Sequence, residues 1–244
     1  MTLFERLHMF HRLLRYRWRA ERAELRYLLG RQFQGGSVFD IGAHRGVYSY
    51  WMHRRFNDGT RVVAFEPQPE LVRHLTDFKQ SFQLNRLMIE PIGLSSQSGS
   101  LEMRRPRNHW GAATVDQFCC DDDQTEVFEV PVTTIDEYVA EHPELRPVRF
   151  IKCDVECHEA EVLAGAARTL REDRPEIIIE WSTPRRAYRE RMLRLAQQLS
   201  YAIFQFEYGR LTRCTGAERH CPPSWELGAH YLMLPHEIAA SAAA

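Results

Sequence analysis

The chain's fold follows from nine consecutive residues, Val38-Phe39-Asp40-Ile41-Gly42-Ala43-His44-Arg45-Gly46. A short apolar run, typical of a buried parallel strand, leads past an acid and through two glycines into a helix-like segment. Gly42 and Gly46 let the backbone turn tightly and approach a ligand, because neither carries a Cβ. The spacing is Asp-x-Gly-x-x-x-Gly, which differs from the Gly-x-Gly-x-x-Gly of dinucleotide-binding proteins. An acid before the first glycine suits a ligand with a cationic amino group.

A second apolar strand also ends in an acid, in the segment Arg61-Val-Val-Ala-Phe-Glu66-Pro67. Pro67 stops this strand and leaves Glu66 at its carboxyl end, which is the edge where open α/β sheets bind ligands. An acid at this point of a doubly wound sheet meets the two ribose hydroxyls of a nucleotide. The two acids in register predict S-adenosylmethionine, which carries both an amino group and a ribose.

A third strand completes the predicted donor site, in the segment Leu87-Met-Ile-Glu-Pro-Ile-Gly93. Its carboxyl end falls where this fold places the adenine ring. Ser49 lies near the start of the helix after the glycine turn, where unpaired amide groups need an acceptor. The residues predicted to bind the donor are Asp40, Gly42, Ala43, Gly46, Ser49, Glu66, Pro67, Ile92, Gly93 and Asp154.

Four segments between Val38 and Trp181 carry a resemblance to a known family. They are Phe39-Asp-Ile-Gly-Ala-His-Arg-Gly-Val-Tyr-Ser49, Ala64-Phe-Glu-Pro67, Val132-Thr-Thr-Ile-Asp136 and Ile151-Lys-Cys-Asp-Val-Glu-Cys-His-Glu159. Together they resemble the FkbM-type class I methyltransferases. That family usually has Asp-x-Glu-Gly-x-Glu in the last segment, and Cys157 replaces the glycine here.

The resemblance implies an α/β fold with a seven-stranded, Rossmann-like class I methyltransferase sheet and helices on both faces. The fourth and fifth strands are predicted at 148–154 and 176–181. An antiparallel pair at 201–207 and 230–234 closes the sheet. Between Leu94 and Phe150 lies more chain than one crossover helix needs, and this insertion is a candidate cover for the acceptor. Its most interesting side chains are His109, Trp110 and Thr114, although a loop anchored by one buried Trp is an equal interpretation.

Outside the methyltransferase domain, predicted at 35–238, we expect an N-terminal helical cap at 1–34 and a disordered tail at 239–244. The cap has arginines between its apolar residues, and we interpret it as folded on the domain and not as a membrane anchor. A membrane-surface contact, a partner helix, a gate and a homodimer contact are the alternatives. The apolar residues at near-helical spacing are Leu3, Leu7, Phe10, Leu14, Trp18, Leu25, Leu28 and Leu29.

Composition limits the class of protein. The net charge is -1, so no global field favours nucleic acid or an anionic membrane. No stretch approaches the roughly twenty apolar residues of a membrane span. The six cysteines form no Cys-x-x-Cys pair and no secretory signal precedes them, which predicts reduced thiols in a cytoplasmic protein. Cys214, His220 and Cys221 match no common zinc spacing.

The turn after the fourth strand is predicted to carry the chemistry, because Asp154, Glu156, His158 and Glu159 crowd there. Methyl transfer requires positioning in a dry pocket, and O-methylation also requires a base. His158 is the first candidate because an unperturbed imidazole is largely neutral at pH 7; a surface histidine at a helix start is the alternative. Asp154 and Glu156 would orient the acceptor or the donor. Asp154 and Glu180 could instead hold a divalent cation, but no third ligand is evident, so no metal is assigned.

The expected function is therefore S-adenosylmethionine-dependent O-methylation of a hydroxyl on a sugar, polyketide or related secondary metabolite, a substrate class that the family resemblance implies. The chief alternative is a noncatalytic donor-binding subunit that recruits a partner protein through its N-terminal helix. A nicotinamide oxidoreductase is disfavoured by the glycine spacing. A nucleic-acid methyltransferase is disfavoured because no Asn-Pro-Pro-Tyr-like motif follows the fourth strand.

Overall fold

The structure is a computed structural model that describes residues 1–56, 59–106, 113–114, 125–181, 186–207, 210–214 and 230–242. Its described strands form one large sheet with the order β10-β9-β11-β8-β7-β1-β2-β3. The five strands from β3 to β8 run parallel. Beyond β8, β11 pairs antiparallel with β8, β9 pairs antiparallel with β11, and β10 pairs antiparallel with β9. The strands are β1 (Ser37–Ile41), β2 (Arg61–Phe65), β3 (Leu87–Glu90), β7 (Val148–Cys153), β8 (Glu176–Glu180), β9 (Tyr201–Glu207), β10 (Arg210–Arg213) and β11 (His230–Pro235).

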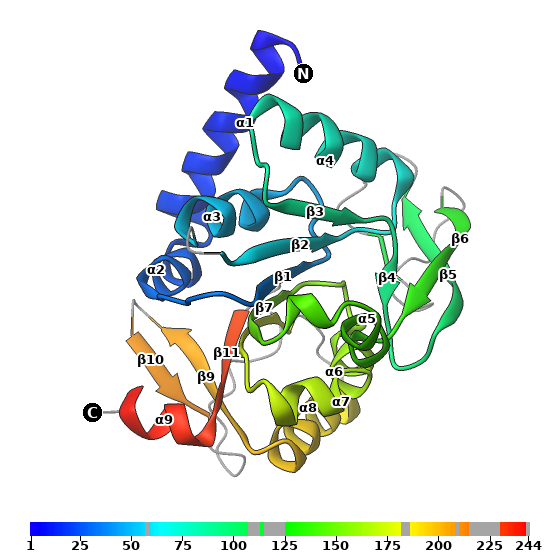
Figure 1. The fold of residues 1–244 in the computed structure, drawn as a ribbon. Helices are drawn as coiled ribbons and strands as arrows, with labels where there is room; N and C mark the ends of the chain where they lie inside the picture. Colours follow the sequence, from blue (N-terminus) through cyan, green and yellow to red (C-terminus); the bar gives the residue numbers. More distant parts are fainter. Residues whose placement is uncertain are drawn as a thin grey trace.

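Helices cover both faces of this sheet (Figure 1). One face packs against α1 (Leu3–Arg15), α2 (Arg22–Gly30), α3 (Val47–Arg55), α4 (Pro69–Ser81) and α9 (His236–Ala242). The other packs against α5 (Ile135–Glu141), α6 (Glu159–Ala164), α7 (Ala167–Glu172) and α8 (Arg186–Gln198). Alternate strand residues enter the two cores, as Val38 and Phe39 do, because successive side chains of a strand point to opposite faces. This is the predicted α/β class I methyltransferase architecture, with β10 as an eighth strand.

The insertion after the third strand forms a second, smaller sheet with the order β4-β6-β5. Its strands are β4 (Gly93–Leu94), β5 (Gly99–Pro106) and β6 (Thr125–Thr133). Met103, Ala113, Val130 and Val132 form a small apolar core of their own against this sheet. Figure 1 shows it beside the carboxyl ends of β2 and β3.

Three sequence predictions about the elements differ from the structure. The helix expected at 159–170 is two helices, because the chain turns at Gly165, where a Cβ would lie 2.0 Å from the Ser95 carbonyl oxygen. The tail expected to be disordered from residue 239 is helical in α9 as far as Ala242, and residues 243–244 lie outside the described ranges. Alanine is the best helix former, and buried Ala239 anchors this helix.

The third difference concerns the N-terminal helices, whose packing face was predicted incorrectly in part. Leu25 and Leu28 of α2 are buried, as expected. In α1, however, the buried residues are Met9 and Leu13, and the apolar stripe expected to pack on the domain faces outward. A π-helical turn, Tyr16–Ala20, joins α1 to α2. No helix in the described ranges is long and apolar enough to cross a membrane.

Candidate active site

A cavity of about 910 Å³ opens at the carboxyl ends of the parallel strands. Residues that follow β1, β2, β3, β7 and β8 line it, which is the edge where open α/β sheets bind ligands. Leu101, Met103, Val130 and Val132 of the small sheet form an apolar part of its wall. The cavity therefore lies between the glycine turn at residues 42–46, which we call the donor loop, and the small sheet, which was the predicted acceptor cover.

Asp40 lies beneath the donor loop, where it holds the start of α3. Its carboxylate accepts hydrogen bonds from the backbone amide of Ser49 at 2.7 Å and from the Ser49 hydroxyl at 2.5 Å. Burial raises the pKa of Asp40 to about 6, and the Ser49 bonds act against that rise. Asp40 does not line the cavity, so its contact with the donor would be indirect, through the loop that it orders.

Gly42 sits at the point where the donor loop meets the turn after β7. Its φ is +74°, and a Cβ there would lie 1.8 Å from the carbonyl oxygen of Asp154. Only glycine permits this approach without displacing backbone. Gly42 therefore has a steric role in packing against the turn after β7.

Glu66 is buried at the floor of the cavity and fixes the loop above it. One carboxylate oxygen accepts from the His44 amide at 2.9 Å, and the other accepts from the Gln68 amide at 3.0 Å. Burial raises the pKa of Glu66 to about 7, opposed by these two bonds. A carboxylate oxygen can accept more than one hydrogen bond, so Glu66 could also receive hydroxyls of a bound ligand.

The structure divides the predicted donor residues into two groups. Gly42, Glu66, Pro67, Ile92, Gly93 and Asp154 line the cavity. The remaining four do not line it, namely Asp40, Ala43, Gly46 and Ser49. We restrict proposed direct donor contacts to the first group.

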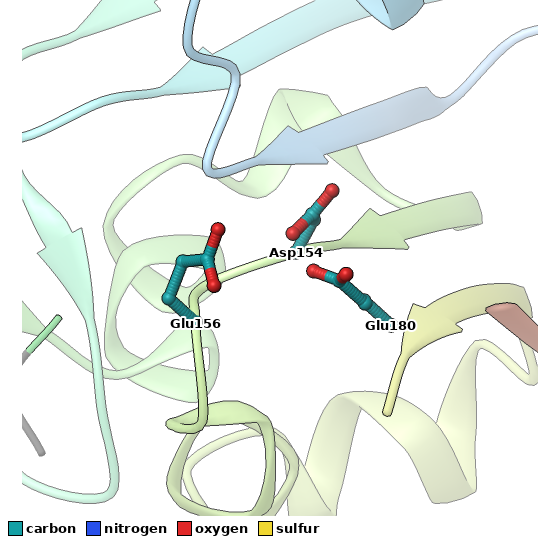
Figure 2. Close-up of side chains that lie close together, drawn as sticks. All are labelled: Asp154, Glu156 and Glu180. Carbon is teal, nitrogen blue, oxygen red and sulfur yellow. The ribbon is translucent and has the colours of Figure 1, made fainter. Parts of the chain in front are cut away.

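Three carboxylates meet at the ends of β7 and β8 (Figure 2). Asp154, Glu156 and Glu180 each place an oxygen within 4.8 Å of the others. Burial acts to raise the pKa of Asp154, but the Lys152 ammonium 3.0 Å away, together with contacts to Glu180 and His230, outweighs burial and holds this pKa well below its usual range. Burial and then Asp154 raise the pKa of Glu180 to about 10. This direction favours the protonated form of Glu180 beside an ionised Asp154.

This charge balance bears on the metal alternative. A divalent cation needs ionised oxygen ligands, and three carboxylates at this spacing are a chemically suitable donor set. Here the buried Lys152 ammonium lies 3.0 Å from Asp154 and already offsets its charge. The residues can form a stable site without a cation, so we assign no metal and derive no step through one.

Glu156 differs from its neighbours because its carboxylate has no hydrogen-bond partner among the described residues. Its backbone is held instead: φ is +51°, and the Thr114 hydroxyl donates to its carbonyl oxygen at 2.6 Å. Burial, followed by the charges of Asp154 and Glu159, raises the pKa of Glu156 to about 7. The side chain lines the cavity, so it has the position and the pKa of a general base.

His158 also lines the cavity, but neighbouring side chains contact both of its ring nitrogens. Nε2 lies 2.9 Å from the Ser95 hydroxyl, and Nδ1 lies 3.8 Å from a Glu161 carboxylate oxygen. The Glu159 carboxylate points inward and accepts hydrogen bonds from the backbone amides of Val155 and Cys157. It also accepts a hydrogen bond from the Tyr188 hydroxyl at 2.5 Å. Glu159 thus fixes the turn that presents Glu156 and His158.

Cys157 occupies a left-handed backbone conformation with φ of +74°, which disfavours a residue with a Cβ. We expect Cys157→Gly to be more stable than Cys157→Ala by about 1 kcal/mol, because both remove the thiol and only alanine keeps the strain. Urea unfolding of the two variants measures the difference. Equal stability, or a more stable alanine variant, would show that this turn is unstrained.

Sequence reasoning missed several cavity residues that come from distant segments. Arg12, Tyr16, Glu21 and Glu24 reach the cavity from the N-terminal helices, and His230 reaches it from β11. Burial acts to lower the pKa of His230, but contacts with Asp154 and Glu24 raise it overall. No local motif marks these residues, because only the packing of α1 and α2 brings them to the strand ends.

Arg12 and Arg45 give one end of the cavity an excess of positive charge. Among the described residues, neither guanidinium forms an ion pair with a carboxylate. Arg12 donates to the Tyr16 hydroxyl at 3.2 Å and stacks on its ring. Burial, then Arg12 and Arg45, lower the pKa of His44 to about 4, so that imidazole is neutral at pH 7. This end of the cavity therefore suits an anionic group of a ligand.

Some sequence predictions fall outside the described ranges. His109 and Trp110 of the insertion do so, whereas Thr114 is buried and contacts Glu156. Of the disfavoured zinc ligands, Cys214 is described, and His220 and Cys221 are not.

Comparison with solved structures supports the fold. An FkbM methyltransferase of Methylobacillus flagellatus KT aligns with 83% of this chain and 44% of its own at 18% identity and a TM-score of 0.50. A Streptococcus mutans protein assigned to the methyltransferases, in complex with SAH, aligns with 88% of this chain and 97% of its own, at 10% identity and a TM-score of 0.51. An rRNA methylase of Streptococcus thermophilus aligns with 87% of this chain and 93% of its own, at 10% identity and a TM-score of 0.50. This chain thus spans less than half of the Methylobacillus protein, and the low identities establish the fold alone.

The sequence comparisons are more specific. No curated protein matches the chain. The model of the methyltransferase FkbM domain matches residues 40–206, which is more than half of the chain and includes the end of β1, the acidic turn and Glu180. The resemblance read from four segments is thereby confirmed, and the chain belongs to the FkbM methyltransferase family.

Proposed function

We propose that the protein transfers the methyl group of S-adenosylmethionine to a hydroxyl of a small-molecule acceptor, such as a sugar, a polyketide or a related secondary metabolite. The observation that carries this proposal is one continuous cavity. Glu66, at the position expected for ribose, and Glu156, a carboxylate without a partner among the described residues, both line it. Family membership supports methyl transfer, and the solved relative in complex with SAH supports this donor.

The acceptor would lie between Glu156 and the small sheet. Methyl transfer is an in-line displacement, so the acceptor oxygen must contact the sulfonium methyl while a base takes its proton. Glu156 is the better-placed base, because its carboxylate is unpartnered within the described residues, whereas His158 contacts Ser95 and Glu161. The apolar wall of Leu101 and Met103 would exclude water and hold an apolar part of the acceptor.

Donor binding is the first test, by isothermal titration with S-adenosylhomocysteine. Glu66→Ala is expected to weaken binding roughly tenfold or more, because charge-assisted bonds to ribose contribute about 1.5 to 3 kcal/mol. Glu66 also orders the His44 loop, so the same titration is made with an analogue that lacks both ribose hydroxyls. If Glu66 binds ribose, the variant loses much less affinity for the analogue.

Equal losses for the two ligands would mean that Glu66 acts only through the loop, and the ribose assignment would be wrong. A wild-type protein that binds neither ligand would contradict the donor itself. Donor binding without methylation of any glycoside or polyketide alcohol in a broad panel would favour the noncatalytic alternative.

A further inference from the structure

Helix α1 has two apolar faces, and the domain covers only one of them. Met9 and Leu13 face the core and are 2% and 0% exposed. The outward residues define what we call the α1 apolar face: Leu3 (72% exposed), Phe4 (78%), Leu7 (60%), Phe10 (47%), Leu14 (36%) and Trp18 (60%). Scattered apolar residues are normal on a surface, but a contiguous apolar patch marks an interaction site.

The spacing shows that this face is continuous. Leu3, Leu7, Phe10 and Leu14 follow one another at intervals of four, three and four residues, which places them on one side of a helix. Trp18 extends the stripe into the π-helical turn, where the Arg17 guanidinium stacks 4.7 Å from its ring centroid. The stripe therefore runs from the first turn of α1 to the start of α2.

Basic residues surround the α1 apolar face. Residues 1–34 contain eight arginines and three glutamates, a net charge of +5, so residues 35–244 carry -6. The arginines Arg6, Arg15, Arg19 and Arg22 are exposed along the same segment. The small net charge of the whole chain conceals this separation. It is the pattern of a helix that lies in a lipid interface, with aromatic and leucine side chains on one face and arginines beside them.

A second copy of the chain is a poorer occupant for this face. A symmetric pair of α1 helices would place Arg6, His11 and Arg15 of both copies along the seam, and each copy brings the same excess of positive charge. An anionic lipid surface supplies the complementary charge as well as an apolar layer.

We propose that the α1 apolar face docks the protein on an anionic lipid surface, with Leu7, Phe10 and Trp18 inserted and the neighbouring arginines at the headgroups. This replaces the interpretation of the N-terminal segment as a cap without a membrane role. The proposal goes beyond methyl transfer and does not rest on it. Because α1 and the π-helical turn after it also place Arg12 and Tyr16 in the cavity wall, docking would bring that wall close to the lipid.

Co-sedimentation of the full chain with vesicles tests the proposal. One vesicle contains phosphatidylcholine and phosphatidylglycerol, and the other contains phosphatidylcholine alone. We expect binding to the anionic vesicle only, and weaker binding as salt rises. The combined variant Leu7→Ser, Phe10→Ser and Trp18→Ser should lose at least tenfold in partitioning. Val127→Ser is the matched control, because Val127 is 48% exposed on β6 and should bind as the wild type does.

Charge is tested separately. The combined variant Arg6→Gln, Arg15→Gln and Arg19→Gln should lose roughly fivefold per arginine, whereas Arg210→Gln, an exposed arginine on β10, should lose little. Circular dichroism melting confirms that each variant folds. No wild-type binding to anionic vesicles, or equal binding by the serine variant, would overturn the proposal. So would a dimer in light scattering that the serine variant dissociates while no lipid binds, since the occupant would then be a second copy.

Discussion

Glu156→Gln is expected to lower methyl-transfer turnover by roughly a hundredfold to ten-thousandfold, with nearly unchanged affinity for S-adenosylhomocysteine. Glutamine keeps the shape of the side chain and cannot accept a proton. Because the pKa of Glu156 is raised to about 7, chiefly by burial, the ionised base accumulates as pH rises through about 7. The wild-type kcat/KM should therefore rise over this range, and the rise should be absent in Glu156→Gln. A product assay with an alcohol found in the acceptor panel measures both.

His158→Ala is the companion variant, because His158 was the base predicted from sequence. If Glu156 is the base, His158→Ala keeps the rise of kcat/KM near pH 7 and loses far less turnover. The reverse result would assign the base role to His158: Glu156→Gln would keep the rise of kcat/KM near pH 7, and His158→Ala would lose most of its turnover. Normal turnover in both variants would leave neither as the base.

Gly42→Ala is expected to destabilise the protein by about 2 to 5 kcal/mol and to abolish measurable donor binding. The left-handed φ costs an alanine about 1 to 2 kcal/mol, and forcing a methyl group into packed structure adds about 1 to 3 kcal/mol. The new Cβ would meet the Asp154 carbonyl oxygen, so the donor loop and the acidic turn would have to separate. Denaturant unfolding and isothermal titration report the two effects.

Gly35→Ala controls for the backbone strain alone. Gly35 has a φ of +65°, and no atom lies within 4 Å of the position of its Cβ. It should therefore cost only about 1 to 2 kcal/mol. If Gly42→Ala is no worse than Gly35→Ala, the close approach to Asp154 has no energetic consequence.

Much of the fold could be predicted because its signals are local. The first and second strands were predicted where β1 and β2 lie, and the antiparallel pair predicted at 201–207 and 230–234 corresponds to β9 and β11. The failures involve long-range packing. Helix α6 ends at Gly165, where a Cβ would meet the carbonyl oxygen of the distant Ser95, and the choice between two apolar stripes on α1 depends on which one packs against the core.

The site was predictable in part for the same reason. A strand that ends in an acid places that acid at the sheet edge, and Glu66 and Asp154 do line the cavity. A shift of one residue along a strand decides whether an acid faces the cavity or the interior. Asp40 faces the interior, where its carboxylate accepts a hydrogen bond from the Ser49 amide. The sequence could not predict that Arg12 and His230 line the cavity, because neither residue lies near a motif.

The small sheet β4-β6-β5 has a consequence for how such an enzyme can change its acceptor. Its apolar core, Met103 with Ala113, Val130 and Val132, is separate from the two large cores on either face of the main sheet. Substitutions in this core would reshape one wall of the cavity and leave the packing around β1 and β7 intact. Selection, natural or in the laboratory, can therefore diversify the proposed acceptor wall while the proposed donor loop stays constant.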